Sequence, residues 1–166
     1  MVHDENSFTF TEEGGGAGLF STAKDLHQYT QMLLKEGELN SVRILTQESV
    51  LEMLKNQNPL SLTPRGLGWK IKKPFSILNK TSLAWSCGPN YPDDSCGHTG
   101  FTVTSLWFDP ISKQIIITLS NRDNLSIENN FEAIKRFRVK LHRLLNLNNS
   151  SRLMKPLKPT SVVTYE

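Results

Sequence analysis

The chain contains one serine and one lysine at the spacing that a nucleophile and its base require. Ser21 and Lys24 form an S-x-x-K pattern, which puts a hydroxyl and an amine one helical turn apart. The same residues also suit the beginning of a helix. Ser21 or Thr22 can cap it, and Asp25 follows Thr22 at the spacing of a capping box. From spacing alone, both interpretations stay open.

Two cysteines, Cys87 and Cys96, offer a second kind of chemistry. They could close a small loop by a disulfide in an exported protein, or remain thiols in a reducing compartment. Cys96-Gly97-His98 also raises the question of a metal site, but zinc needs three or four ligands and no second Cys pair or nearby His supplies them. We therefore expect no metal and no other cofactor, and the compartment stays open.

Other candidate groups favour plainer interpretations. Asp93-Asp94 are adjacent, so their side chains diverge in an extended loop, and we expect solvated carboxylates rather than a catalytic pair. His3-Asp4-Glu5 could suggest acid–base chemistry, but no role for it follows from the sequence. Residues 14–18 are rich in glycine, yet Leu19 stands where G-x-G-x-x-G needs its third glycine. A phosphate cradle is not expected there.

The hydrophobic pattern predicts an α+β domain that would position these groups. Helices are expected at residues 22–36 and 47–56, and strands at 68–71, 98–108 and 114–120, with 109–113 as a hairpin connection. The clearest helix is expected at 127–146, with a core-facing stripe of Ile127, Phe131, Ile134, Phe137, Leu141, Leu144 and Leu145. We divide the chain into a domain of residues 1–146 and a flexible tail of 147–166. The sheet is small for the length, and at least one edge looks uncovered.

Composition excludes several classes of protein. With 37% hydrophobic and 21% charged residues, the chain reads as soluble and globular, and no apolar run is long enough to span a bilayer. No secretory signal is visible in residues 1–6. The net charge is +3, and a basic stretch carries much of the excess: Lys135, Arg136, Arg138, Lys140 and Arg143. We interpret this stretch as the solvated face of a helix rather than as a nucleic-acid site.

Three stretches, taken in order, resemble the serine β-lactamase and penicillin-binding protein family, especially its class C and esterase-like branch. The first is Val2-His3-Asp4-Glu5-Asn6 followed by residues 18–26, the second is residues 97–110, beginning Gly97-His98-Thr99-Gly100, and the third is residues 119–122. The resemblance covers roughly residues 2–145. It implies the C-terminal part of a β-lactamase-like fold, a small antiparallel sheet with flanking helices and a long final helix.

In that family, a serine in an S-x-x-K helix attacks a carbonyl, the lysine and a Y-x-N tyrosine manage its proton, and a K-T-G strand lies alongside. In the branch resembled here, His often replaces the lysine of K-T-G. The resemblance implies that His98 and Thr99 bind the polar end of the substrate and that Gly100 keeps the strand open. It also implies that the backbone N–H of Phe101 is an oxyanion donor. Val103 departs from the pattern, because the family usually has glycine there.

Two of the family's three catalytic elements have no match in this sequence. The resemblance places the catalytic serine far upstream of H-T-G, so Ser21 and Lys24 align with a helix start outside the site. No Y-x-N or S-x-N substitute is present: Tyr29, Tyr91 and Tyr165 lack the asparagine two positions later. The first strands and the central helix of the family fold are missing as well. We therefore expect exposed apolar surface and weak stability unless a partner supplies the rest.

These observations predict a fragment of a β-lactamase-related serine hydrolase, acting by acyl transfer on a β-lactam, peptide or ester carbonyl and inactive alone. The partners expected are a small-molecule or peptide acyl substrate and a complementary chain or second copy, with no nucleic acid and no membrane span. The alternative is a non-catalytic relative that binds a ligand or partner, which Val103 and the missing motifs favour.

Overall fold

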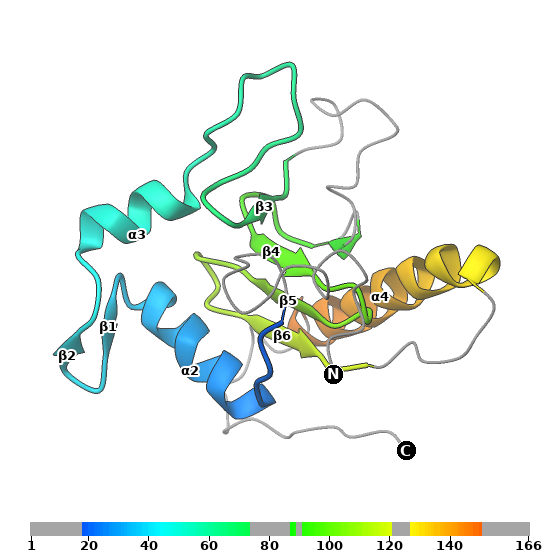
Figure 1. The fold of residues 1–166 in the computed structure, drawn as a ribbon, viewed down its shortest axis with the longest axis horizontal. Helices are drawn as coiled ribbons and strands as arrows, with labels where there is room; N and C mark the ends of the chain where they lie inside the picture. Colours follow the sequence, from blue (N-terminus) through cyan, green and yellow to red (C-terminus); the bar gives the residue numbers. More distant parts are fainter. Residues whose placement is uncertain (1–17, 74–86, 89–90, 121–126, 151–166) are drawn as a thin grey trace.

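The computed structural model describes residues 18–73, 87–88, 91–120 and 127–150. Three helices and six short strands lie in these ranges (Figure 1). The elements in chain order are α2 (Ala23–Leu34), β1 (Glu38–Leu39), β2 (Val42–Arg43), α3 (Gln47–Leu54), β3 (Lys70–Ile71), β4 (Cys96–Thr99), β5 (Ser105–Phe108), β6 (Ile115–Thr118) and α4 (Ile127–Ser150). This mixture confirms the predicted α+β class.

The central feature is a four-stranded antiparallel sheet in the order β3-β4-β5-β6. The expected hairpin connection after Phe108 is confirmed, because the Asp109 carboxylate accepts hydrogen bonds from the backbone N–H groups of Ile111 and Ser112. The prediction of one strand over residues 98–108 is wrong, because this segment is the end of β4, a tight turn and then β5. The turn begins at Gly100 and includes Val103 in a left-handed conformation (φ 78°), so the backbone reverses direction. The hydrophobic pattern alone suggests that the strand continues.

Helix α2 begins and ends as its sequence predicts. Thr22 is the N-cap, and its hydroxyl accepts a hydrogen bond from the Asp25 N–H at 3.1 Å. Gly37 adopts φ 95°, and a Cβ there would lie 2.2 Å from the Leu45 carbonyl oxygen. Glycine is therefore required both by the left-handed conformation and by the close backbone.

A small hairpin that the sequence did not predict separates α2 from α3. Strands β1 and β2 are joined by Asn40 and Ser41, both with positive φ, as a two-residue turn of a twisted hairpin needs. Helix α3 then begins after Thr46, whose hydroxyl accepts from the Ser49 N–H. In the predicted α3 core, Val50 is buried, but Leu51 is 55% exposed.

The main core lies between the sheet and the two helices α2 and α3. Phe108, Ile71 and Cys96 project from this face, and Leu33 and Val50 pack against them from the helices. Trp69 contacts Phe108 edge to face, with ring centroids 5.1 Å apart. This layer is almost entirely apolar, as expected for a sheet face covered by amphipathic helices.

Helix α4 covers the opposite face of the sheet (Figure 1). Tyr91 lies between the two, because its ring contacts Trp107 of β5 and His142 of α4. Part of the predicted apolar stripe is wrong: Phe137 and Leu144 are 56% and 61% exposed, whereas Arg138 and His142 are buried. Leu141 is half-buried, and the side chains of Ile127, Phe131 and Ile134 lie outside the described residues. The polar side of the helix that carries Arg138 and His142 therefore packs inward. Periodicity cannot predict this, because it shows which residues share a face of a helix but not which face packs against the sheet.

The predicted domain boundary falls near the end of α4. Residues 147–150 belong to the helix, and residues 151–166 of the predicted tail lie outside the described residues. Among the described helices, none combines the length and apolar character that crossing a bilayer demands.

Candidate active site

The H-T-G residues lie where β4 ends and the chain turns into β5. His98 pairs with Leu106 and Thr99 with Ser105, so the two residues point to opposite faces of the sheet. The turn is closed by hydrogen bonds from Gly100 N–H to the Thr104 carbonyl and from Val103 N–H to the Gly100 carbonyl, at 2.8 and 3.1 Å. The predicted candidate residues thus lie at one end of the sheet, next to a hydrogen-bonded turn.

His98 lies on the same face as the apolar core but remains open to solvent. Partial burial lowers the pKa of His98, and the positive charges of Lys70 and Arg65 lower it further. The ring is therefore held in its neutral form near pH 7, able to donate from one nitrogen and accept at the other.

Thr99 has a partner that the sequence did not suggest. The Lys70 ammonium donates a hydrogen bond to the Thr99 hydroxyl at 3.0 Å, although Lys70 is only 7% exposed. Burial, followed by the charges of Arg65 and Arg138, lowers the pKa of Lys70. The sequence signal for this contact was a lysine between Trp69 and Ile71 in a predicted strand. Lysine is rarely buried without a polar partner, so its place in a short apolar strand indicates that it contacts one.

The glycines of this segment allow close packing. At Gly97, a Cβ would lie 2.2 Å from the Trp107 ring and 2.6 Å from the Leu106 carbonyl oxygen. At Gly100, a Cβ would lie 2.5 Å from the Thr104 hydroxyl. Gly97 therefore lets β4 pack directly against the Trp107 ring. The prediction that Gly100 leaves room for an approaching substrate stays a prediction. The oxyanion role of the Phe101 N–H also stays a prediction.

Val103 sits in a conformation that disfavours a branched side chain. Its φ of 78° lies in the left-handed region, and its side chain is buried. Such a conformation costs a β-branched residue on the order of 1–3 kcal/mol. Val103, which stands two residues after Phe101 where the family usually has glycine, therefore adopts a backbone conformation that is costly for valine.

The S-x-x-K residues occupy the start of α2. Ser21 precedes the N-cap Thr22, and its hydroxyl lies 3.5 Å from the Thr22 carbonyl oxygen, while Lys24 is exposed in the first turn. This arrangement supports the interpretation of Ser21-Thr22 as a helix start. His3-Asp4-Glu5 and residues 14–17 lie outside the described residues.

The adjacent carboxylates Asp93 and Asp94 form separate ion pairs. Asp93 pairs with Lys72 and Asp94 with Lys73, so each carboxylate is turned to its own lysine. Both are exposed. The geometry agrees with the prediction of solvated loop carboxylates.

Both cysteines are thiols, buried in different clusters. Desolvation raises the pKa of Cys87 and of Cys96 to about 12. Since the thiolate is the reactive form, neither serves as a nucleophile at neutral pH. Among the described residues, no group of three or more His, Cys, Asp or Glu side chains could hold a metal ion.

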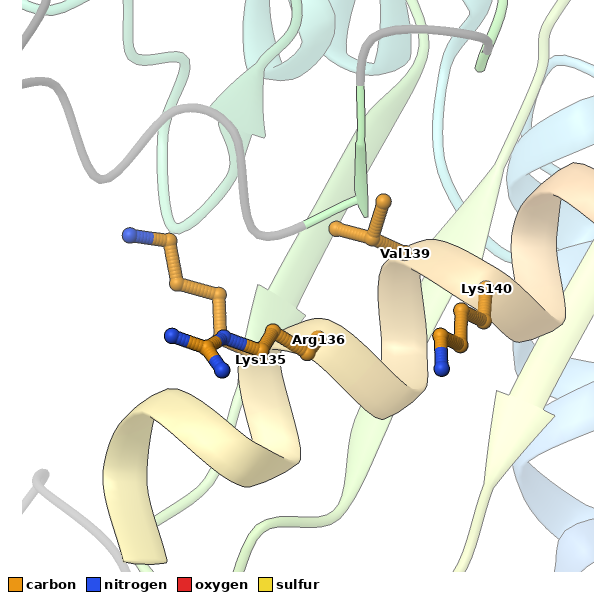
Figure 2. Close-up of a pocket in the computed structure, with 4 residues that line it drawn as sticks. All are labelled: Lys135, Arg136, Val139 and Lys140. Atoms are coloured by element: carbon orange, nitrogen blue, oxygen red, sulfur yellow. The ribbon is translucent and has the colours of Figure 1, made fainter. Parts of the chain in front are cut away.

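The basic stretch of α4 is only partly a solvated face. Arg136, Lys140 and Arg143 are exposed as predicted, but Arg138 is 5% exposed, which corrects the prediction for that residue. A hollow of about 280 Å³ on this helix is lined by Lys135, Arg136, Val139 and Lys140 (Figure 2). None of the H-T-G residues lines it.

Comparisons with known proteins agree with the resemblance seen in the sequence. The family model described as Beta-lactamase matches residues 1–137. Putative D-alanyl-D-alanine carboxypeptidases of Salmonella paratyphi B (strain ATCC BAA-1250 / SPB7), Salmonella newport (strain SL254) and Salmonella heidelberg (strain SL476) are each 29% identical over 130 residues, which is 78% of this chain and 28% of each relative. The chain thus spans less than a third of the length of these relatives. Since the family model covers well over half of its residues, the chain belongs to the β-lactamase family.

Proposed function

We propose that this chain supplies the H-T-G wall of an acyl-transfer site and that another polypeptide segment supplies the attacking serine. The carrying observation is the position of His98-Thr99-Gly100 at the end of a sheet strand that turns at once into β5. Family membership and the names of the relatives support a substrate with a β-lactam, peptide or ester carbonyl.

Within this proposal, the residues have separate tasks. His98, neutral and open to solvent, contacts the polar end of the substrate. Thr99 shares that task through its hydroxyl, which the Lys70 ammonium holds in place. Gly100 leaves room for the substrate, and the Phe101 N–H stabilises the negative charge that develops on the carbonyl oxygen. Such a donor typically contributes about 3–4 kcal/mol to the rate.

Exposed apolar surface supports a complementary chain as the partner. Strand β6 ends the sheet among the described strands, and an unpaired edge is a template for another strand. Leu119, just beyond β6, is 52% exposed, and Phe137 and Leu144 of α4 are also exposed. A second segment that paired with β6 and covered these side chains would complete the core and bring the nucleophile.

The second candidate function is a non-catalytic binding protein. Val103 favours it, because its side chain and strained backbone stand where the family keeps glycine. In this case, the chain would fold cooperatively as a monomer and bind its ligand without acylation.

A fluorescent penicillin separates these functions. The chain alone should give no covalent adduct. Mixed with a segment of a family member that carries S-x-x-K and Y-x-N, it should give an adduct on that segment, and His98→Ala should slow labelling by roughly 10-fold, because the polar end of the substrate loses one hydrogen bond. An adduct on Ser21, tested with Ser21→Ala, would overturn the assignment of the helix cap. A mixture that binds but never labels would reject catalysis and favour the binding protein.

A further inference from the structure

The face of α4 that points away from the sheet carries apolar side chains as well as charged ones. Its exposed residues recur at a spacing of three and four, so they share one side of the helix. They are Ala133, Arg136, Phe137, Lys140, Arg143 and Leu144. Phe137 and Leu144 are 56% and 61% exposed and lie two helical turns apart, so they form an apolar strip along the helix. Large apolar side chains aligned in this way are typical of a helix surface that another element covers.

Positive charge runs along the same face, beside the apolar strip. Arg136, Lys140 and Arg143 are all exposed and form a cation row. The sequence contains no Asp or Glu from residue 133 to residue 150. The ion pairs of the described residues involve other basic side chains, namely Arg43, Lys55, Lys72 and Lys73. The cation row therefore has no carboxylate partner in the part of the chain that the structure describes.

The hollow on α4 borders the cation row on the side opposite to the apolar strip. Lys135 and Val139 form one wall, and Arg136 and Lys140 form the other (Figure 2). Its volume is about 280 Å³. The aliphatic stems of lysine and arginine are apolar below their charged ends, so such walls can receive an apolar side chain. Carboxylates beside that side chain would then meet the charged ends.

A helix with acidic and apolar residues matches this surface more closely than other occupants do. A second copy of α4 would bring like charges together, which is unfavourable. A lipid surface calls for a helix with one wide apolar face, whereas the apolar strip has two large side chains next to cations. A partner helix rises by about 1.5 Å per residue, as α4 does, so its own residues seven positions apart match the spacing of Phe137 and Leu144.

We propose that the outward face of α4 binds an acidic amphipathic helix of the complementary segment. Its carboxylates pair with the cation row, and its apolar side chains cover the apolar strip and enter the hollow. This inference rests on the proposed function, which already places a complementary segment over Phe137 and Leu144, and it adds the chemistry of that segment. The surface extends the interface proposed at the edge of β6.

Titration calorimetry tests the cation row, with the whole chain and two synthetic helical peptides of equal length. One peptide carries a leucine stripe flanked by glutamates, and the other has lysine at every glutamate position. The acidic peptide should bind and the basic peptide should not. Arg136→Glu combined with Lys140→Glu should weaken binding of the acidic peptide by roughly 10-fold or more, and should allow the basic peptide to bind.

The matched control is Lys24→Glu combined with Lys35→Glu. These lysines are exposed at the two ends of α2, and their replacement changes the net charge by the same amount. The control should bind the acidic peptide like the wild type. Equal weakening in the two double variants, or no binding of the acidic peptide to the wild type, would overturn the site.

Phe137→Ala combined with Leu144→Ala tests the apolar strip. Both side chains are exposed, so the variant should unfold at the wild-type temperature, but it should bind the acidic peptide roughly 10-fold more weakly or worse. Polyglutamate, which has no leucine, should also bind more weakly than the acidic peptide. Unchanged affinity in either comparison would leave only non-specific charge attraction and reject the proposal. Binding to phosphatidylglycerol vesicles without binding of the acidic peptide would assign the face to lipid instead and reject it too.

The failure of this inference and the failure of acyl transfer can be told apart. The peptides carry no S-x-x-K, so their binding does not require a reaction. If the acidic peptide binds but fluorescent penicillin never labels the mixture with the family segment, acyl transfer is wrong and the α4 surface stands. If that mixture is labelled equally fast when the chain carries Arg136→Glu and Lys140→Glu, acyl transfer stands and the α4 surface is wrong.

Discussion

The two faces of one small sheet are built on different principles. On the face toward α2 and α3, Phe108 and Ile71 pack with Leu33 and Val50, and the layer is satisfied by apolar contact. On the face toward α4, Trp107 and Tyr91 share the interior with Arg138 and His142, and several polar atoms have no partner. The first face is a closed apolar core, whereas the second buries polar atoms that have no hydrogen-bond partner among the described residues.

Neighbouring residues of β5 show this contrast most clearly. Trp107 and Phe108 are both fully buried, but they point to opposite faces. The Trp107 Nε1 has no hydrogen-bond partner, whereas Phe108 carries no polar atom to satisfy. Burial alone therefore does not measure how much a side chain stabilises the fold, because an unsatisfied donor offsets part of the gain.

The largest effect should come from the apolar face. Phe108→Ala should lower the free energy of unfolding by about 3–5 kcal/mol, because it opens a cavity in a packed layer. Trp107→Phe, on the other face, should cost less than about 2 kcal/mol, since it also removes the unsatisfied N–H. Urea unfolding measures both, and equal costs would erase the contrast between the faces.

Acid should destabilise the α4 face selectively. Desolvation lowers the pKa of His142 to about 4, against an ordinary value of 6.5, so the folded state resists protonation there. The stabilisation is complete above pH 6.5 and is lost as the pH falls toward 4, by an amount on the order of 3 kcal/mol. Urea unfolding between pH 4 and 7 should show this loss, and His142→Phe should remove most of it. The lowered pKa of His98 acts in the same direction. If His142→Phe left the pH dependence of the unfolding free energy unchanged, other groups and not His142 would cause it.

Removing the buried charge should help the fold. Arg138→Met should raise the free energy of unfolding by about 1–2 kcal/mol, because it deletes a buried cation that has no ion-pair partner among the described residues and leaves an apolar side chain of similar length. Arg143→Met, on the exposed face, should change it by less than about 0.5 kcal/mol. A destabilised Arg138→Met protein would show that the guanidinium already has a partner.

The smallest effect concerns the H-T-G turn itself. Val103→Gly relieves the left-handed strain but loses a buried side chain, so the net change should stay within about 1 kcal/mol. Val103→Ala loses nearly the same packing and keeps most of the strain, so it should be the less stable of the two. Calorimetric unfolding decides the order. If Val103→Ala proved more stable than Val103→Gly, the turn would not be strained.

Much of the architecture could be predicted from local sequence. Thr22 and Thr46 start helices because their hydroxyls bond the backbone N–H groups of the first turn, and the hairpin after Phe108 follows from Asp109-Pro110. The division of residues 98–108 into two strands could not be predicted, because the turn depends on Val103 adopting a conformation that its residue type disfavours. The β1–β2 hairpin was missed for a similar reason, since Asn40 and Ser41 do not include the glycine that usually marks such turns.

The sequence by itself determined the helices, most of the sheet, the H-T-G motif and the family, because capping, periodicity and motif order are properties of neighbouring residues. Only the tertiary structure decided which side of α4 meets the sheet and that Lys70 lies against Thr99. A helical pattern shows which residues share a face, but not which surface of the protein that face packs against. The burial of Arg138 and the exposure of Phe137 are outcomes of how two elements far apart in the chain pack together, and no local pattern encodes that contact.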